Sequence, residues 1–225
     1  MAVNGQVVTA LGSKVDPATA RISVEGRKVE LASPRLYILL NKPAGYTCTR
    51  RDPHAKRTVL ELVRGVDAYL YPAGRLDVDT EGVLILTNDG DFAQMLTHPS
   101  HELDKTYRAT VVGAVSQEAL GLLRRGIELE DGISAPARAV VVGTRAPTDV
   151  DVPRARRIRP PVSEPVSVVD LTIHEGRKRQ VRRMFAALGH PVIRLARTAI
   201  GSLQLDDLPL GKWRRLTEEE VEGLR

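Results

Sequence analysis

The sequence has little cysteine, few aromatic residues and no long apolar run, and each shortage excludes a class of protein. The single cysteine, Cys48, rules out an intrachain disulfide and a cysteine-rich zinc site, and we expect it to be a small buried hydrophobe. Aromatic residues make up 4% of the chain, so aliphatic side chains must build most of the core. The longest wholly apolar runs, such as residues 36–40, are far too short to span a bilayer.

The first ten residues also lack the basic start and the apolar core of a secretory signal peptide. With one cysteine and no membrane span, the sequence favours the reducing cytoplasm and predicts no membrane association. A glycine-rich phosphate loop of the P-loop or Rossmann type is missing as well, and no internal repeat is visible. The kind of protein must therefore be inferred from its charges and its short motifs.

Positive charge is concentrated in one part of the chain. The 33 Lys and Arg residues exceed the 28 Asp and Glu residues by a net charge of +5. Residues 151–200 hold eleven basic and four acidic residues, so this segment carries more than the whole net charge. A basic cluster of this kind is typical of proteins with a polyanionic partner, and a solvated basic surface without a partner is the alternative.

A loop with two carboxylates is predicted within the segment GRLDVDTEGVLILTNDG, residues 74–90. Residues 83–87 are apolar and partly β-branched, which predicts a buried strand. The Asn-Asp-Gly that follows can cap a helix starting near Gly90. Asp77 and Asp79 then lie in a loop directly before a core strand, where rigid scaffolds often hold working residues.

The residues alone allow two other interpretations of this loop. Asp77 and Asp79 are ordinary turn carboxylates if they only accept hydrogen bonds from nearby backbone N–H groups. Two carboxylates two residues apart also share a face of an extended chain, and they can hold Mg²⁺ for phosphoryl chemistry. No neighbouring histidine or acidic cluster completes such a site, so we expect no metal.

A basic helix is predicted from Glu175 to the helix-ending Gly189. Its apolar positions follow the spacing i, i+3, i+4 and i+7 from Val181, which defines one buried face. Arg182 lies on the shoulder of that face, where a charge usually needs a partner, and Asp77 is a natural one. A surface helix with a broad basic face is the alternative.

The rest of the chain after residue 33 predicts an α+β fold, with a mixed, largely antiparallel sheet and helices packed around it. A helix is expected after Ser116, and the expected strands are residues 34–41, 69–73, 105–112, 127–129, 138–142 and 166–174. Residues 145–165 hold five prolines and five arginines, which predicts a mobile basic loop able to touch an RNA backbone. A solvated linker is the alternative.

Several motifs resemble those of the pseudouridine synthases, in particular the RsuA/RluB-type branch that modifies ribosomal RNA. The Asp77 segment resembles the family's catalytic motif, and NKPAGY at residues 41–46 resembles the element that opens its catalytic domain. Lys-Thr-Tyr ending at Tyr107 resembles the element with the active-site tyrosine. The segment EGRKRQVRRMFAALGHPV resembles the third motif, in which the arginine of Gln-x-Arg, here Arg182, pairs with the catalytic aspartate.

The leading residues 1–33 predict two hairpins, one of them at an Asn-Gly turn, with too few apolar residues for an independent core. This segment resembles the C-terminal half of an S4-type RNA-binding domain, whose helical first half does not precede it. The chain is then either a natural short form or starts too far downstream. Residues 34–225 would form the catalytic domain.

The resemblance implies a set of site residues. Asp77 would be the covalent nucleophile, Arg182 would keep it ionised and oriented, and Tyr107 would stack on the flipped target base. Leu195 would line the pocket, with a plain core position as its alternative. The implied phosphate contacts, which position RNA without reading its sequence, are Lys42, Arg75, Lys178, Arg179 and Arg183.

The expected function is therefore isomerisation of one uridine of ribosomal RNA, free or in a precursor subunit, by a monomer without metal or other cofactor. Two rival functions remain. An RNA-binding or ribosome-assembly protein needs the basic helix but not Asp77. A metal-dependent phosphodiesterase would use Asp77 and Asp79 and would cleave RNA. The sequence does not reveal which uridine is modified, or whether Asp77 would attack the sugar or the base.

Overall fold

The computed structural model describes residues 1–16, 19–29, 34–50, 56–148 and 164–225. The chain divides into two compact units, Met1–Arg35 and Leu36–Arg225. The boundary predicted after residue 33 lies beside this division. That the first unit is an S4-like RNA-binding segment stays a prediction.

The first unit is a small sheet of two hairpins. Its strands, in the spatial order β2-β1-β3-β4, are β1 (Ala2–Val3), β2 (Gln6–Val7), β3 (Ile22–Val24) and β4 (Arg27–Val29). The predicted Asn-Gly turn is present, with positive φ at both Asn4 and Gly5 as tight hairpins require. Among the described residues of this unit only Ile22 is buried.

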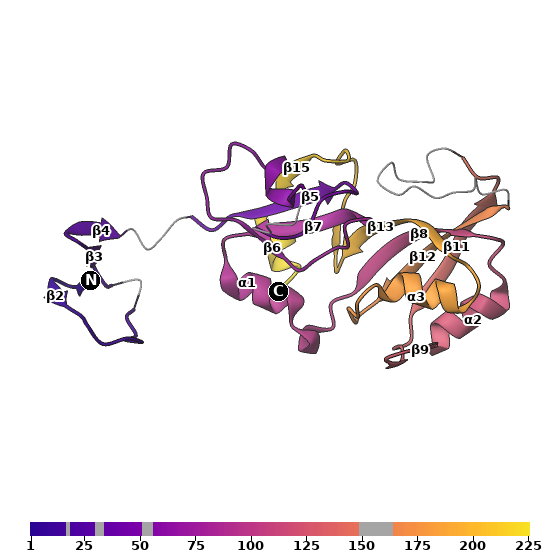
Figure 1. Ribbon diagram of the computed structural model, residues 1–225, viewed down its shortest axis with the longest axis horizontal. Coiled ribbons are helices and arrows are strands. Elements are labelled where there is room, and N and C mark those ends of the chain that lie inside the picture. The colour runs from indigo at the N-terminus through magenta and orange to yellow at the C-terminus, as the bar shows by residue number, and fades with distance from the viewer. Residues whose placement is uncertain (17–18, 30–33, 51–55, 149–163) are drawn as a thin grey trace. The chain divides into compact units, whose positions relative to one another are not determined.

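The second unit is built on one large sheet (Figure 1). Within the described residues the strands follow the order β11-β12-β8-β13-β7-β5-β15, with β14 beside β13 and β6 beside β7. All pairings in this sheet are antiparallel except that of β13 with β7. The strands are β5 (Tyr37–Lys42), β6 (Tyr71–Ala73), β7 (Glu81–Thr87), β8 (Lys105–Val112), β11 (Arg138–Arg145), β12 (Val166–Ile173), β13 (Val192–Ile200), β14 (Leu203–Gln204) and β15 (Trp213–Arg215).

Helices and 3₁₀ turns surround this sheet, and a separate hairpin, β9 (Glu128–Leu129) with β10 (Gly132–Ile133), follows the second helix. The helical elements are η1 (Val59–Leu62), α1 (Gly90–Thr97), η2 (Pro99–His101), α2 (Gln117–Arg125), α3 (Gln180–Ala187) and α4 (Glu218–Glu222). In the part of the chain that is described, no helix has the length and apolar character needed to cross a membrane. The arrangement confirms the predicted α+β class with a mixed, largely antiparallel sheet.

The half of the sheet around β8 and β12 packs against α2 and α3. Their apolar faces, including Leu120, Leu123, Met184 and Phe185, lie in one buried cluster with inward residues of β8, β11, β12 and β13. The alternation along these strands places one face in this core and leaves the other more exposed.

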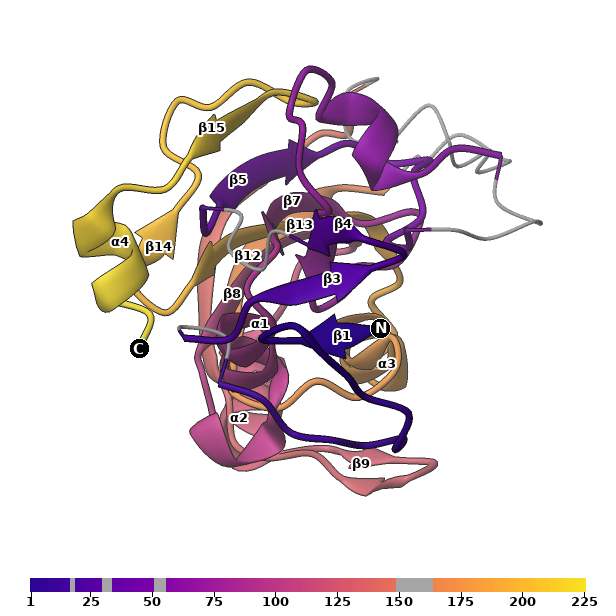
Figure 2. The same cartoon turned by 90° about the vertical axis from the view of Figure 1, so that its left-hand side faces the viewer.

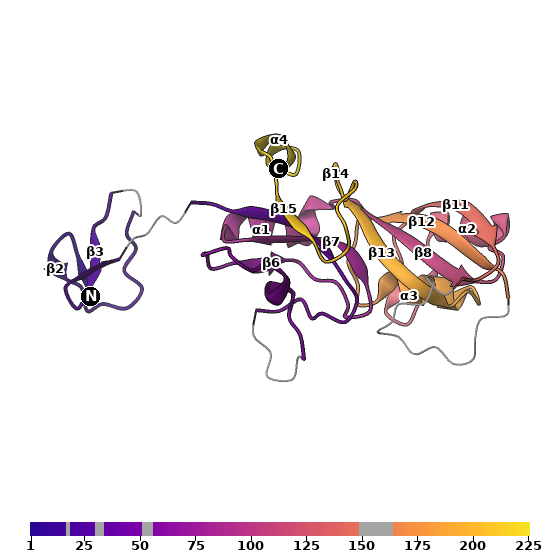
Figure 3. The same cartoon turned by 90° about the horizontal axis from the view of Figure 1, so that it is seen from above.

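The half around β5 and β7 is covered on both faces, so β7 is buried along its whole length. Val83 and Ile85 point into a cluster with α1 and α4, whereas Leu84 and Leu86 point into a cluster with η1. Figure 2 shows α4 beside β14 and β15, and in Figure 3 α4 and the turn Val59–Leu62 lie on opposite sides of this half. A strand held on both faces gives the loop before it a rigid end.

Local sequence signals placed most of these elements correctly. Ser116 caps α2 through the Ala119 N–H and Gly126 ends it, and Asp89 caps α1 through the Phe92 N–H. The basic helix is an exception, because α3 begins at Gln180 and not at Glu175. The basic Pro-rich loop predicted at residues 145–165 lies largely outside the described residues.

Candidate active site

The Asp77 loop borders a large pocket of about 1110 Å³ in the second unit. The loop enters β7 directly after Thr80, whose N–H donates to the Asp77 carbonyl at 3.1 Å. The Asp77 side chain keeps 35% of its surface exposed, so its carboxylate is open to a substrate in the pocket. The loop is therefore rigidly attached and its first carboxylate is accessible.

Lys42 fixes the backbone of this loop. Its side chain has no exposed surface, and its ammonium donates to the carbonyl oxygens of Thr80 (2.8 Å), Asp77 (3.1 Å), Pro43 (3.2 Å) and Val78 (3.4 Å). Burial lowers the pKa of Lys42, and the nearby acidic groups oppose this effect. A fully buried ammonium cannot reach an RNA phosphate, so the predicted phosphate contact by Lys42 is corrected. The residue shapes the loop.

We predict that Lys42→Met lowers the free energy of unfolding by about 1–3 kcal/mol, because it leaves buried carbonyl groups without a donor. Urea denaturation measures this change. Lys212→Met is the matched control, since Lys212 is exposed and should change stability by less than about 0.5 kcal/mol. Equal effects of the two substitutions would contradict the role of Lys42 as the organiser of the loop.

Arg182 anchors the same loop from α3. Its side chain is 7% exposed, and Nη2 lies 2.9 Å from the Asp79 carbonyl oxygen and 3.3 Å from Asp79 Oδ2. Nη1 donates to the carbonyl of Val192 at 3.3 Å. The predicted position at the edge of the core is confirmed, and these contacts are with the second aspartate of the loop. A direct pair of Arg182 with Asp77 stays a prediction.

Arg179 is the arginine beside the Asp77 carboxylate. Its Nη1 lies 3.6 Å from Asp77 Oδ2 and 3.2 Å from Asp79 Oδ1. The residue has a left-handed backbone, with φ of +52°, directly before the first turn of α3. This conformation is uncommon for a residue with a Cβ and marks a constrained site. Arg179 and Arg182 together surround the two carboxylates with positive charge.

A second network explains why α3 starts later than predicted. The Glu175 carboxylate accepts hydrogen bonds from the Ala135 N–H (2.9 Å), from Arg177 Nε (3.0 Å) and from the Gln180 side chain. Arg177 also donates to backbone carbonyls of the β9–β10 hairpin. These bonds hold residues 175–179 in a loop that lines the pocket. The predicted helix included these residues, and the bonds explain why they are not helical.

Tyr107 and Leu195 come from neighbouring strands and both line the pocket. Tyr107 is half-buried on β8 and packs against two of the hydrophobic clusters, whereas Leu195 is 4% exposed on β13. Leu195 pairs with Ala109 in the sheet, so it shares a face with Tyr107 two residues away. The structure thus brings Asp77, Tyr107 and Leu195 to the same pocket, as the sequence predicted.

The predicted phosphate contacts differ in their freedom to bind RNA. Arg75 and Lys178 are exposed at the pocket and form no ion pair within the described ranges. Arg183 is held by Asp131 through two bonds of 2.7 and 3.0 Å, and Arg179 is held by the loop carboxylates. An RNA phosphate would have to displace those carboxylates, so Arg75 and Lys178 are the better placed pair.

The interpretation of Asp77 and Asp79 as metal ligands gains no support from their surroundings. Both carboxylates face guanidinium groups, which take the oxygen atoms that a cation would need. Among the residues that the structure describes, no group of three or more metal-ligating side chains is found.

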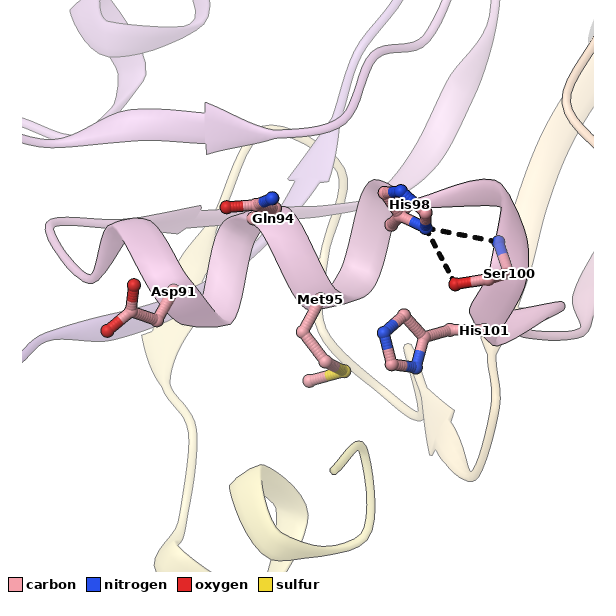
Figure 4. A pocket seen from close by; sticks show the side chains of 6 residues that line it. All are labelled: Asp91, Gln94, Met95, His98, Ser100 and His101. Atoms are coloured by element: carbon pink, nitrogen blue, oxygen red, sulfur yellow. Dashed lines mark hydrogen bonds between the residues drawn. The ribbon is translucent and has the colours of Figure 1, made fainter.

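A smaller hollow lies beside the pocket at the end of α1. Figure 4 shows its lining residues, which are Asp91, Gln94, Met95, His98, Ser100 and His101. His98 belongs to both cavities, and its Nδ1 is hydrogen-bonded to Ser100 Oγ at 2.6 Å. The hollow thus adjoins the site on the side of α1.

Sequence reasoning missed three pocket cations, Arg177, Lys105 and Arg197, of which the last two follow from strand geometry. Lys105 lies two residues before Tyr107 on β8, and Arg197 lies two residues after Leu195 on β13. In a strand, residues two apart share a face. The strand period applied to Tyr107 and Leu195 would have pointed to both.

Comparison with known proteins adds to this geometry. A family model described as RNA pseudouridylate synthase matches residues 36–187. Ribosomal large subunit pseudouridine synthase B of Bacillus subtilis (strain 168) is 44% identical over 223 residues, with 99% of this chain and 84% of the relative covered. Ribosomal small subunit pseudouridine synthase A of Vibrio cholerae is 38% identical over 210 residues, with 92% and 80% covered.

A solved structure described as a pseudouridylate synthase has a TM-score of 0.69 and 32% identity, with 100% of this chain and 88% of that chain covered. The match of the family model runs through the Asp77 loop, Tyr107 and Arg182. The relatives include large- and small-subunit synthases, which confirms the predicted RsuA/RluB-type resemblance. The chain belongs to the RNA pseudouridylate synthase family, and it is an isomerase that converts uridine to pseudouridine.

Proposed function

We propose that this protein converts a specific uridine of ribosomal RNA to pseudouridine, with Asp77 as the nucleophile. The observation that carries the proposal is the position of the Asp77 carboxylate, which is exposed to the pocket and lies 3.6 Å from Arg179 Nη1. The loop behind it is fixed by Lys42 and Arg182. Such a carboxylate is preorganised for attack on a bound nucleotide.

The reaction breaks the bond between uracil N1 and ribose C1′ and forms a bond between C5 and C1′, while C5 loses a proton and N1 gains one. Asp77 attacks either the ribose C1′ or the base C6, which frees the base to turn within the pocket. The Arg179 guanidinium lies beside the carboxylate and orients it for this step. Tyr107 and Leu195 form the apolar walls that hold the detached base.

Arg182 takes the role of ion-pair partner in this proposal. In the structure it binds the carbonyl and the carboxylate of Asp79, and Arg179 bridges Asp79 and Asp77. Arg182 is therefore linked to Asp77 through the Asp79 carboxylate and Arg179, and it supports the nucleophile through this chain of ion pairs.

Ribosomal RNA, free or within a subunit precursor, is the proposed substrate. The names of the relatives from Bacillus subtilis and Vibrio cholerae assign them to the large and the small ribosomal subunit. The excess of basic residues in 151–200 fits a polyanionic partner. A bacterial cytoplasm and a monomeric enzyme that needs no metal go with this proposal.

The test is direct. The protein is incubated with 16S and 23S ribosomal RNA and with intact subunits, with and without EDTA; pseudouridine is quantified after digestion to nucleosides and located by reverse transcription after carbodiimide modification. We expect pseudouridine at one position, no effect of EDTA and no strand cleavage. Cleavage that EDTA suppresses would instead establish a phosphodiesterase. Tight RNA binding without pseudouridine in any substrate would establish a binding protein.

A further inference from the structure

Arg197 is a buried arginine on the floor of the pocket. Only 4% of the residue is exposed, and Nε and Nη2 donate to the Val83 carbonyl at 2.9 and 2.8 Å. β13 and β7 pair at only two positions. Beyond the second pair, the hydrogen bonds of the Arg197 guanidinium join the two strands. The strands approach so closely there that a Cβ on Gly82 would lie 2.1 Å from the Arg197 carbonyl oxygen. The position of the guanidinium is therefore fixed by backbone contacts.

The charge of Arg197 is not neutralised within the described residues. Its third nitrogen, Nη1, forms no hydrogen bond there, and no carboxylate forms an ion pair with the group. A buried charge without a counter-ion is costly. A neutral hydrogen-bond donor could bind the Val83 carbonyl oxygen as well. The fold alone therefore gives no reason for the positive charge of Arg197.

Lys105 is a second unneutralised cation on the same face. Arg197 pairs with Tyr107 across the sheet, and Lys105 lies two residues from Tyr107, so all three side chains are on the pocket side. The Lys105 ammonium donates to the carbonyl oxygens of Leu103 (2.8 Å) and His174 (3.5 Å). Burial lowers the pKa of Lys105, the charge of Arg197 lowers it further, and the Asp104 carboxylate, which pairs with Arg138, opposes both effects.

Two other cations of the pocket are already paired with acidic or carbonyl groups, whereas Arg75 and Lys178 lie exposed at its rim. Arg179 is paired with the loop carboxylates, and Arg177 is bound to Glu175 and to the β9–β10 hairpin. Two desolvated cations without a carboxylate form a place for an anion. The base of uridine carries only neutral polar groups. The anions that an RNA strand can place in this site are therefore its phosphate groups.

We propose that Arg197 and Lys105 bind one of the two phosphate groups that flank the target uridine. This inference rests on the proposed function and adds a substrate-binding subsite inside the pocket. The subsite fixes the ribose relative to Asp77, because the phosphate is joined to that ribose. It differs from the outer contacts by Arg75 and Lys178, which lie on the exposed rim.

The test uses an RNA stem-loop that contains the modified uridine, once reverse transcription has located it. Two analogues carry a neutral methylphosphonate, one at the 5′ and one at the 3′ phosphate of that uridine. Wild-type kcat/KM should fall by about 10- to 100-fold for one of the analogues, the range for charge-assisted hydrogen bonds. Lys105→Met and Arg197→Met should show a similar loss on the native RNA and little further loss on that analogue.

Arg108→Met is the matched control, because Arg108 lies on β8 facing away from the pocket and pairs with Asp170. It should keep wild-type activity and the full penalty of the analogue. If Arg197→Met does not fold, Lys105→Met decides the outcome. A full analogue penalty in Lys105→Met, or no penalty in the wild type, overturns the subsite and leaves the proposed function intact. A wild type that forms no pseudouridine overturns the proposed function itself.

Discussion

Asp77→Asn will abolish pseudouridine formation and leave the fold and RNA binding intact. The amide has nearly the same shape but is a poor nucleophile, so the covalent step is lost. We expect a decrease in rate of at least about 10³-fold, as is usual when a nucleophile that acts with its supporting groups is removed. Single-turnover rates on the identified RNA and binding measured by fluorescence anisotropy separate the two effects.

The control for this prediction is Asp67→Asn, which makes the same chemical change at an exposed aspartate outside the pocket. It should have wild-type rates. A residual rate in Asp77→Asn within about tenfold of the wild type would contradict the assignment, because an effect below about 1.4 kcal/mol is too small for a lost nucleophile.

Arg182→Met will both destabilise the protein and slow the reaction. Removing the guanidinium takes the donor at 2.9 Å from the Asp79 carbonyl and one of the arginine partners from the Asp79 carboxylate, in a largely buried place. Breaking such a pair costs about 3–5 kcal/mol, and we expect the lower end because Arg179 still contacts Asp79. Urea denaturation gives the stability, and single-turnover rates at a temperature where the variant is folded give the catalytic effect.

Arg183→Met is the matched control on the same helix. Arg183 pairs with Asp131 near the surface, so its loss should change stability by less than about 1 kcal/mol. If Arg182→Met were as stable and as active as Arg183→Met, Arg182 would have no special role in holding the catalytic loop.

Much of the fold was predictable because local signals and tertiary packing agree. Residues 83–87 are apolar and β-branched, and they lie within a fully buried strand. Ser116 and Gly126 mark the two ends of α2 by their own capping chemistry. In these cases the residues that define an element are neighbours in the sequence, so no distant contact is needed to identify it.

The predictions were wrong where distant contacts decide the conformation. The predicted helix begins at Glu175, but side-chain bonds of Glu175 to Ala135 and Arg177 keep this segment out of the helix. In the sequence, Lys42 is a basic residue beside a turn. Its burial and its contact with the Asp77 loop are visible only in the folded structure. A one-dimensional pattern does not contain these pairings.

The sequence predicted which residues form the candidate site better than it predicted their contacts. Asp77, Tyr107 and Leu195 meet at one pocket, as their motifs predicted. The partner of Arg182 depends on the turn between Asp77 and Asp79, which decides the carboxylate that faces α3. Spacing along the sequence cannot fix that choice, because both aspartates lie in the same short loop.

The central claim is that Asp77 performs the isomerisation of uridine. The most direct measurement follows the release of tritium from ribosomal RNA labelled at carbon 5 of uridine, because formation of the C5–C1′ bond expels that hydrogen, whereas RNA binding and strand cleavage leave it in place. Wild type, Asp77→Asn and Asp67→Asn are compared side by side on RNA and on subunits. We predict release by the wild type and by Asp67→Asn and none by Asp77→Asn. Equal release by all three proteins would contradict the claim.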